Sequence, residues 1–325
     1  MSKEIDLWNF VAARLRRDES VTLLVVAESS GSSPGRAGYK MAVASDGELC
    51  GSIGGGLMEV ELAERAKVTG KGPESGVELI EQVHRKNVPN SSGMICSGRQ
   101  SVIAKRLSRD DLTTIDEIIR RLDAQNDVSF EISNLRFQII ENSQIDPAFS
   151  FSQTSEADFE YQEKLGCKEN LFIIGGGHCA LALSEVASRL GFRISIFDDR
   201  PSLNTLDKNR FADEITRLDS YENIADHVPD GDDVFIVVMT LGYVSDAVVI
   251  RRLIGHNVKY LGVLGSKAKM TTLIKELKAE GFDPRKLARI STPIGIPINS
   301  RTPEEIAVSI AAEMIAVRNG ANLSR

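Results

Sequence analysis

The stretch that decides the fold of this chain runs from residue 171 to residue 201 and reads LFIIGGGHCALALSEVASRLGFRISIFDDRP. An apolar run ends in three glycines, Gly175 to Gly177, and an amphipathic segment follows them. A second β-rich run then ends in Asp198 and Asp199. The order of strand, glycine turn, helix, strand and acid predicts a Rossmann-type unit, with a G-x-G-x-x-A fingerprint that closes at Ala180.

The glycine turn is the first candidate ligand site. Glycines let a backbone approach a phosphate closely, and the helix N-terminus behind them offers free N–H groups. We therefore expect Gly175, Gly176, Gly177 and His178 to contact a cofactor. Asp198 is placed to hold a ribose hydroxyl pair, and it would repel a ribose 2′-phosphate, which favours NAD over NADP; Arg200 weakens that preference. The alternative is a βαβ unit whose glycines serve only close packing.

Further candidate ligands follow the other predicted strands of the second half, at 234–239 and 258–265. The carboxyl ends of parallel strands share one edge of a doubly wound sheet, and ligands bind there. The candidate residues at this edge are Asp198, Asp199 and Arg200, then Thr240, then Gly265, Ser266 and Lys267. The last three supply a glycine turn, a hydroxyl and a cation at a helix start, which suits a phosphate or a carboxylate. A helix cap followed by a surface lysine is the alternative.

Length and alternation of elements predict two domains. A chain of 325 residues is comfortable for two. We expect an α/β protein with a mixed α+β domain over residues 1–166 and a Rossmann-like domain with a doubly wound parallel sheet over residues 167–325. The last helix has a clear start, because Thr302, Pro303 and Glu305 form a capping-box pattern.

The first half mixes helices with antiparallel strands. Helices are predicted over 5–17, 57–70 and 112–124, and strands over 21–28, 77–83 and 101–107. Two hairpins are predicted, one around Asp46-Gly47 and one within 128–140. We expect the polar stretch 141–158 to be irregular.

Composition limits the partners. The net charge is −7, which disfavours a nucleic-acid partner. No apolar run approaches the roughly 20 residues that span a membrane, and the start MSKEIDLWNF lacks a signal-peptide apolar region. We therefore expect a cytoplasmic protein with no membrane partner, and a homodimer on the general frequency of such assemblies. The four cysteines show no C-x-x-C spacing and the four histidines no ligand pattern, which argues against a structural zinc site.

A second glycine system occurs in the first half. Gly54, Gly55 and Gly56 precede a predicted helix, so their backbone N–H groups are candidates to cradle an anion. Ser33 and Arg36 lie on a preceding loop that is expected to face these glycines. A tight connection between a strand and a helix is the alternative interpretation.

Cys96 is a candidate for sulfur or metal chemistry. It lies in the glycine-rich stretch GMICSGRQ, near Arg99. A thiol in an exposed turn beside a cation would have a lowered pKa and could act as a nucleophile or as a soft metal ligand. A lone cysteine is otherwise commonly a small buried apolar residue.

Several blocks in one order resemble the XdhC/CoxI accessory proteins of molybdenum hydroxylases such as xanthine dehydrogenase. The first half carries GSSPGRAGYKMAV, GSIGGGLMEVELAERA and MICSGRQ. The second half carries LFIIGGGHCALAL, FDDRP, GVLGSKAKM and TPEEIAVSIAAEMIAVR. The resemblance covers most of the chain.

This resemblance implies a cofactor-maturation chaperone rather than a metabolic enzyme. Such proteins bind the molybdenum cofactor, protect it while a cysteine desulfurase supplies the terminal sulfur, and promote its insertion into the apo molybdenum hydroxylase. The implied role of Cys96 is a sulfur or molybdenum contact. The chain departs from the family pattern at Leu57, where members often have a cysteine, and at Thr240 to Tyr243, where many carry a Thr-His-x-His stretch.

Two alternatives rest on the residues alone. The fingerprint fits an NAD-dependent oxidoreductase of unknown substrate, although the sequence shows no acid–base pair such as Tyr-x-x-x-Lys. A non-catalytic nucleotide-binding scaffold is the other alternative.

Overall fold

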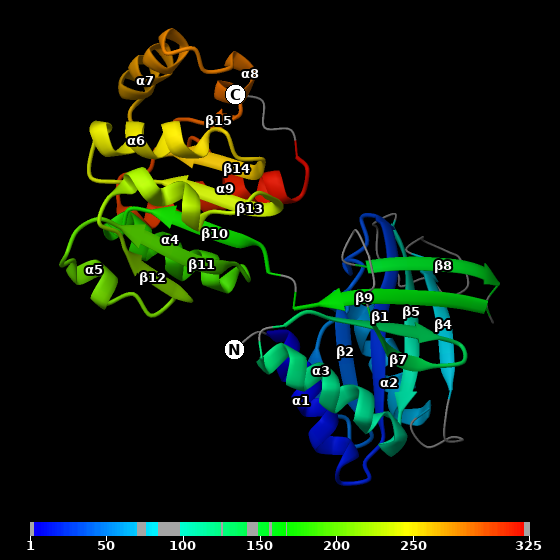
Figure 1. The fold of residues 1–325 in the computed structure, drawn as a ribbon. Helices are drawn as coiled ribbons and strands as arrows, with labels where there is room; N and C mark the ends of the chain where they lie inside the picture. The colour runs from blue at the N-terminus through cyan, green and yellow to red at the C-terminus, as the bar shows by residue number, and fades with distance from the viewer. Residues whose placement is uncertain are drawn as a thin grey trace. The chain divides into compact units, whose positions relative to one another are not determined.

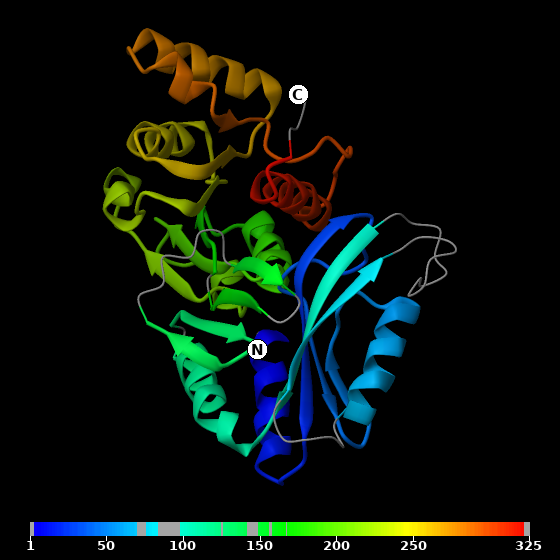
Figure 2. The same cartoon turned by 90° about the vertical axis from the view of Figure 1, so that its right-hand side faces the viewer.

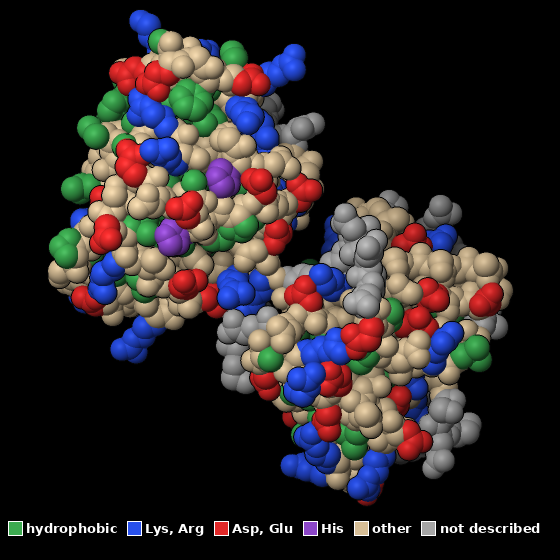
Figure 3. Space-filling model, viewed as in Figure 1, with side chains coloured by type: hydrophobic (Ala, Val, Ile, Leu, Met, Phe, Trp, Pro, Cys, Tyr) green, Lys and Arg blue, Asp and Glu red, His purple; other side chains and the backbone are tan. Residues whose placement is uncertain are grey.

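The computed structural model describes residues 3–69, 76–83, 98–124, 126–141, 149–155, 158–166 and 168–321. The chain divides into two compact units, Met1–Cys167 and Lys168–Arg325. We name them the N-terminal unit and the Rossmann unit and describe each by itself (Figure 1). The face drawn in Figure 3 carries acidic and basic side chains interspersed on both units.

The N-terminal unit is built from two antiparallel sheets and the helices against them. Among its described residues, one sheet has the order β3-β2-β1-β5-β4 and the other the order β7-β6-β9-β8. The strands of the first sheet are β1 (Val21–Gly31), β2 (Lys40–Ala44), β3 (Leu49–Gly51), β4 (Val77–Val83) and β5 (Gly98–Leu107). The second sheet contains β6 (Val128–Ser133), β7 (Phe137–Ile140), β8 (Phe149–Ser155) and β9 (Asp158–Leu165). The helices are α1 (Lys3–Leu15), α2 (Gly56–Thr69) and α3 (Leu112–Asp123), with a 3-10 turn η1 (Arg109–Asp111) before α3.

Strand β1 is the centre of this unit, because its continuous apolar run is buried on both faces. Successive side chains of a strand point to opposite faces. Leu23 and Val25 pack with α1, α3 and the second sheet, whereas Leu24 and Val26 pack with α2. Figure 2 shows α1 and α2 on opposite sides of this sheet. The predicted helices and both predicted hairpins of the first half are confirmed.

One prediction for this unit is wrong: the stretch 141–158 is not all irregular. Residues 149–155 form β8, which pairs antiparallel with β9. The side chains of Phe149 and Phe151 pack against the core, while Ser150 and Ser152 between them are exposed. The polar residues that suggested a loop are therefore the solvent face of an edge strand. Residues 142–148 and 156–157 lie outside the described residues.

The Rossmann unit is a parallel sheet with helices on both faces. Within residues 168–321 the strand order is β12-β11-β10-β13-β14-β15, and every pairing is parallel. The strands are β10 (Asn170–Ile174), β11 (Arg193–Asp198), β12 (Glu214–Arg217), β13 (Gly231–Val238), β14 (Val258–Val263) and β15 (Ile290–Ser291). The helices are α4 (His178–Arg189), α5 (Asn204–Asp207), α6 (Tyr243–Leu253), α7 (Lys267–Ala279), α8 (Pro284–Leu287), α9 (Pro303–Arg318) and the 3-10 helix η2 (Tyr221–His227).

The two faces of this sheet have separate cores. The helices α4, α5 and α9 pack on one face, and α6, α7, α8 and η2 pack on the other. The predicted capping box is present, since Thr302 accepts a hydrogen bond from the backbone of Glu305 and the Glu305 carboxylate accepts one from the backbone of Thr302. The predicted fold class, a mixed α+β unit followed by a doubly wound parallel sheet, is confirmed. None of the helices in the described residues has both the length and the apolar character needed to cross a bilayer.

Candidate functional site

The candidate residues of the Rossmann unit meet at one edge of its sheet, as expected. The strand registers place Ile174, Val238 and Val263 side by side at the ends of β10, β13 and β14. The turn after β10 is joined directly to the next strand, because Gly175 donates its N–H to the carbonyl of Phe197 at 2.7 Å. It also touches the residue after β13, since a side chain built at Gly175 would lie 2.8 Å from the Cα of Thr240.

The three glycines of the turn have different roles. Gly175 has φ +106° and a Cβ there would lie 2.4 Å from the carbonyl oxygen of Met239, so no side chain fits. A Cβ at Gly176 would lie 2.4 Å from the side chain of Leu206. At Gly177, by contrast, a Cβ would meet nothing within 4 Å among the described residues. The first two glycines are therefore required by packing, and only Gly177 leaves room for a ligand.

Gly177 is also the N-cap of α4. Its backbone is extended and no side chain caps the helix, so the first N–H groups of α4 are open to an external acceptor. The side chain of His178 is exposed at the same place. These features are those expected of an anion site at a helix N-terminus.

Asp198 is fully buried and its carboxylate is engaged within the chain. One oxygen, Oδ1, accepts hydrogen bonds from the backbone N–H and the Nε of Arg200 at 2.9 and 2.8 Å. The other, Oδ2, accepts from the backbone N–H of Gly176 and from Nη2 of Arg200, both at 2.6 Å. Burial alone would raise the pKa of Asp198, but the hydrogen bonds from Arg200 and Gly176 outweigh it and hold this pKa below its usual range. Asp199, the next residue, is exposed.

Sequence reasoning missed a buried ion pair at the same edge. Asp246 in the first turn of α6 is 1% exposed and accepts a hydrogen bond from Nζ of Lys269 at 2.7 Å. The same carboxylate accepts the backbone N–H of Thr240 at 3.2 Å and its hydroxyl. The predicted lysine, Lys267, is exposed instead. The spacing of Lys269 three residues after Ser266, the N-cap of α7, was the available signal.

The glycine turn of the N-terminal unit already holds an anion, which is a carboxylate of the chain itself. Oε2 of Glu59 accepts hydrogen bonds from the hydroxyl of Ser52 at 2.6 Å, from the backbone of Ile53 at 2.8 Å and from the backbone of Gly55 at 3.0 Å. Burial would raise the pKa of Glu59, yet these bonds lower it overall. The turn thus has the predicted affinity for an anion, but an external anion must displace Glu59.

The loop that contains Ser33 faces this turn, as predicted. A Cβ at Gly54 would lie 2.3 Å from the backbone N of Gly35, and a Cβ at Gly98 would lie 2.5 Å from the backbone N of Ser33. The hydroxyl of Ser33 is buried and donates to the Oε1 of Gln100 at 2.7 Å, so it serves the packing of the loop. Arg36 is exposed.

Both units match sequence models of one family. The model described as the XdhC Rossmann domain matches residues 171–314, and the model described as the XdhC and CoxI family matches residues 14–76. The chain belongs to the XdhC and CoxI family. As a member of this family it has a relative that matches it over nearly its whole length. It is 24% identical over 327 residues to a probable xanthine dehydrogenase component of Bacillus subtilis, covering 94% of this chain and 96% of that protein.

A second XdhC and CoxI relative is longer. The chain is 25% identical over 299 residues to the uncharacterized protein YqeB of Escherichia coli, which covers 91% of this chain but only 43% of the length of YqeB. Among solved structures, that of a xanthine dehydrogenase from Bacillus halodurans has a TM-score of 0.74 at 22% identity, covering 99% of this chain and 97% of that one. This likeness concerns the fold.

The described cysteines of this XdhC and CoxI protein do not form a metal centre. Of the described residues, Cys50 and Cys179 are free and half-buried, and burial raises the pKa of both thiols. The described part of the chain holds no group of three or more His, Cys, Asp or Glu side chains that could bind a metal ion. Cys96, the predicted sulfur or molybdenum contact, lies outside the described residues.

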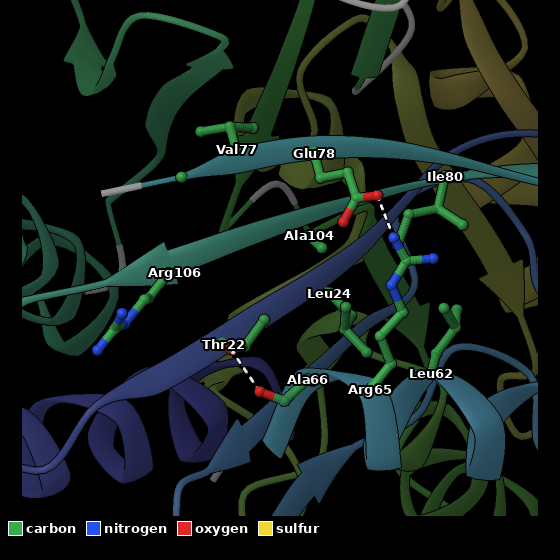
Figure 4. A pocket seen from close by; sticks show the side chains of 11 residues that line it. Thr22, Leu24, Leu62, Arg65, Ala66, Val77, Glu78, Ile80, Ala104 and Arg106 are labelled. Atoms are coloured by element: carbon green, nitrogen blue, oxygen red, sulfur yellow. Dashed lines mark hydrogen bonds and ion pairs between the residues drawn. The ribbon is translucent and has the colours of Figure 1, made fainter. Parts of the chain in front are cut away.

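A cavity of about 210 Å³ lies between α2 and the sheet of the N-terminal unit (Figure 4). Its floor is apolar and includes Leu24, Leu62 and Ala104. An ion pair between Arg65 and Glu78 lies at its side. None of the residues predicted for the site lines this cavity.

Proposed function

We propose that the chain is an accessory protein of a molybdenum hydroxylase of the xanthine dehydrogenase type. In this proposal it binds the molybdenum cofactor as cargo, supports the sulfuration of that cargo by a cysteine desulfurase, and promotes its insertion into the apo-enzyme. The family membership of both units supports the proposal, and so does the name of the Bacillus subtilis relative. A cytoplasmic homodimer is the form in which we expect it to act.

The observation that carries the proposal is the open glycine at the edge of the Rossmann sheet. Gly177 leaves space at an uncapped helix N-terminus, where a phosphate tail would accept N–H donors. Lys267, with Thr240, Gly265 and Ser266 on the neighbouring loops, would complete the surroundings of that phosphate. The turn at Gly54 to Gly56, with Ser33 and Arg36, is the second candidate, and it requires Glu59 to move away.

The metal end of the cargo needs few protein ligands, because a pterin dithiolene already holds the molybdenum. A single soft donor would suffice, and we propose Cys96 for this contact or for handling the incoming sulfur. The raised pKa of the Cys50 and Cys179 thiols makes those two residues poor alternatives.

The test is the pterin content of purified protein. The protein is isolated from cells that make the molybdenum cofactor, the denatured eluate is oxidised, and fluorescent pterin is measured per chain. We expect a nearly stoichiometric amount from the unaltered chain. A blank result from cofactor-competent cells would contradict the proposal.

Gly177→Asp places the site. Aspartate is a favoured N-cap, so this variant should fold well, while its carboxylate occupies the open N–H groups and repels a phosphate. Gly177→Ser is the matched control, because serine is an equally favoured N-cap without the charge. We expect pterin to be lost in Gly177→Asp and largely kept in Gly177→Ser. Equal retention in both would remove Gly177 from the site.

Cys96→Ser tests the sulfur end separately. Loss of cofactor retention together with loss of hydroxylase maturation is expected. A variant that behaves as the unaltered chain in both assays would remove Cys96 from the mechanism.

An NAD-dependent oxidoreductase is the second candidate function. The fingerprint turn with its open Gly177 favours it, and no residue role for proton transfer can be assigned from the sequence. Stoichiometric NAD binding with turnover of a small carbonyl or alcohol would support it. Absence of both NAD and pterin binding would favour a non-catalytic scaffold.

A further inference from the structure

The hydrogen bonds of Asp198 bear on which nucleotide the Rossmann unit accepts; this inference rests on the nucleotide-binding part of the proposed function. In dinucleotide sites an acid at this position accepts a hydrogen bond from the ribose 2′-hydroxyl. A carboxylate has about four lone-pair positions. In Asp198 four hydrogen bonds fill them, three from Arg200 and one from Gly176. A ribose hydroxyl could bind this carboxylate only by displacing one of these donors.

The space beside Asp198 is filled as well. The short helix α5 packs onto the glycine turn, where the hydroxyl of Thr205 donates to the carbonyl of Gly176. Thr205 and Leu206 are 6% and 3% exposed, and Leu206 is the residue that a side chain at Gly176 would strike. The atoms of the chain itself therefore seal the turn on the side where Asp198 lies.

Arg200 retains donors that can bind an external group. A guanidinium has five N–H donors, and Asp198 accepts two of them, from Nε and Nη2. The side chain is 27% exposed, so the remaining donors have access to solvent. The ion pair also neutralises Asp198, which removes the charge that would repel a ribose 2′-phosphate. Asp199 is the exposed charge beside it.

We propose that Asp198 is a positioning residue and that Arg200 determines specificity, so that the Rossmann unit selects a nucleotide with a phosphate at the ribose 2′ position over one with a free ribose diol. Asp198 fixes the Gly176 turn and orients the guanidinium. Arg200 then offers its outer donors to the phosphate, the arrangement by which an arginine near this position accommodates NADP. The preference for NAD expected from Asp198 alone loses its basis, because the carboxylate is paired.

The test measures the affinities of NADPH and NADH for the full-length protein by nucleotide fluorescence. We expect NADPH to bind at least about tenfold more tightly, the size of a charge-assisted hydrogen bond. In Arg200→Ala, Asp198 loses the two donors of the guanidinium and becomes free to accept the diol, so the ratio should shift by about tenfold or more toward NADH. A merely structural role for Arg200 would weaken both nucleotides equally.

Thr216→Ala on the neighbouring strand β12 is a control that should leave the ratio unchanged. Tighter binding of NADH by the unaltered chain would overturn the inference. So would an unchanged ratio in Arg200→Ala at an unchanged melting temperature, or binding of neither nucleotide. The pterin assay decides the proposed function independently, since cargo content does not depend on which dinucleotide binds.

Discussion

The carboxylate of Glu59 accepts the backbone N–H of Gly55 at 3.0 Å, so the glycine turn of the N-terminal unit closes on an acid from the helix that follows it. The same carboxylate binds Ser52 and Ile53. An acid near a helix N-terminus also interacts favourably with the helix dipole. The turn is therefore an anion site whose occupant is built into the chain.

Removing that occupant should expose the site. Glu59→Ala is expected to lower the free energy of unfolding by about 1 kcal/mol, the usual cost of losing a capping acceptor at a helix start. In the variant, inorganic phosphate should raise the melting temperature, because the released N–H groups bind it. The unaltered chain should show a much smaller effect of phosphate at the same ionic strength. Equal effects in the two proteins would contradict this account of the turn.

The same acid predicts a pH dependence. The pKa of Glu59 is lower in the folded protein than its ordinary value, so its contribution to stability is present above the ordinary value and is lost as the pH falls through the folded pKa. Between about pH 5 and pH 3 the unaltered chain should lose more stability than Glu59→Ala. Denaturant titrations of both proteins at several pH values measure the difference. Parallel losses would show that Glu59 does not contribute.

The pair of Asp246 and Lys269 should be a stability determinant of the Rossmann unit. Asp246→Ala leaves Lys269 and the backbone of Thr240 without their acceptor. Breaking a buried pair costs about 3–5 kcal/mol, and because Lys269 retains 26% exposure we expect about 2–3 kcal/mol. Lys267→Ala, at an exposed lysine two residues away, is the matched control and should change stability by less than about 0.5 kcal/mol. Similar values for the two variants would refute the assignment.

Neighbouring glycines of the fingerprint should respond differently to the same change. Gly176→Ala forces a methyl group against Leu206 and is expected to cost about 1–3 kcal/mol. Gly177→Ala meets open space and has a favourable φ of −71°, so its cost should stay below about 1 kcal/mol. Thermal unfolding of the two variants makes the comparison. A larger loss in Gly177→Ala would mean that the turn packs otherwise than described.

Lys40 and Glu163 form a second buried pair, in the N-terminal unit. The Nζ of Lys40 donates to Glu163 and, at 2.9 Å, to the carbonyl of Gly38, while Glu163 also accepts the hydroxyl of Tyr161 at 2.9 Å. Lys40→Met should cost about 3–5 kcal/mol, because it leaves the carboxylate buried without its cation. Lys67→Met, at a more exposed lysine on α2, should stay within about 0.5 kcal/mol. Chemical denaturation of both variants tests this contrast.

Much of the fold could be predicted because its signals are local. The run from residue 171 to 201 contains strand, turn, helix and strand in sequence, and the capping box at Thr302 fixes the start of the last helix. Strand β8 escaped prediction because only one of its faces is apolar, and an edge strand can be polar on the other. Its partner strand β9 supplies the register that the local sequence lacks.

The candidate site was predictable in its placement and not in its bonding. Topology brings the loops after parallel strands to one edge, so Gly177, Thr240 and Lys267 could be grouped from the sequence. The partners of Asp198 and Asp246 could not, because hydrogen bonds depend on side-chain directions that no periodicity records. Asp246 and Lys269 are 23 residues apart and meet only through the pairing of β13 with β14. Glu59 looked like an ordinary acid of a first helical turn.

The backbone contacts of Gly35, Gly54 and Gly98 have a consequence for how such sequences vary. Each of these positions would drive a side chain into main-chain atoms of another loop, at 2.3 to 2.5 Å. A substitution at one of them cannot be rescued by shrinking a partner, because the partner is already bare peptide. Three segments far apart along the chain are thus locked to change together or not at all. Their blocks of sequence persist as a record of three backbones in contact, even in a descendant whose chemistry has been lost.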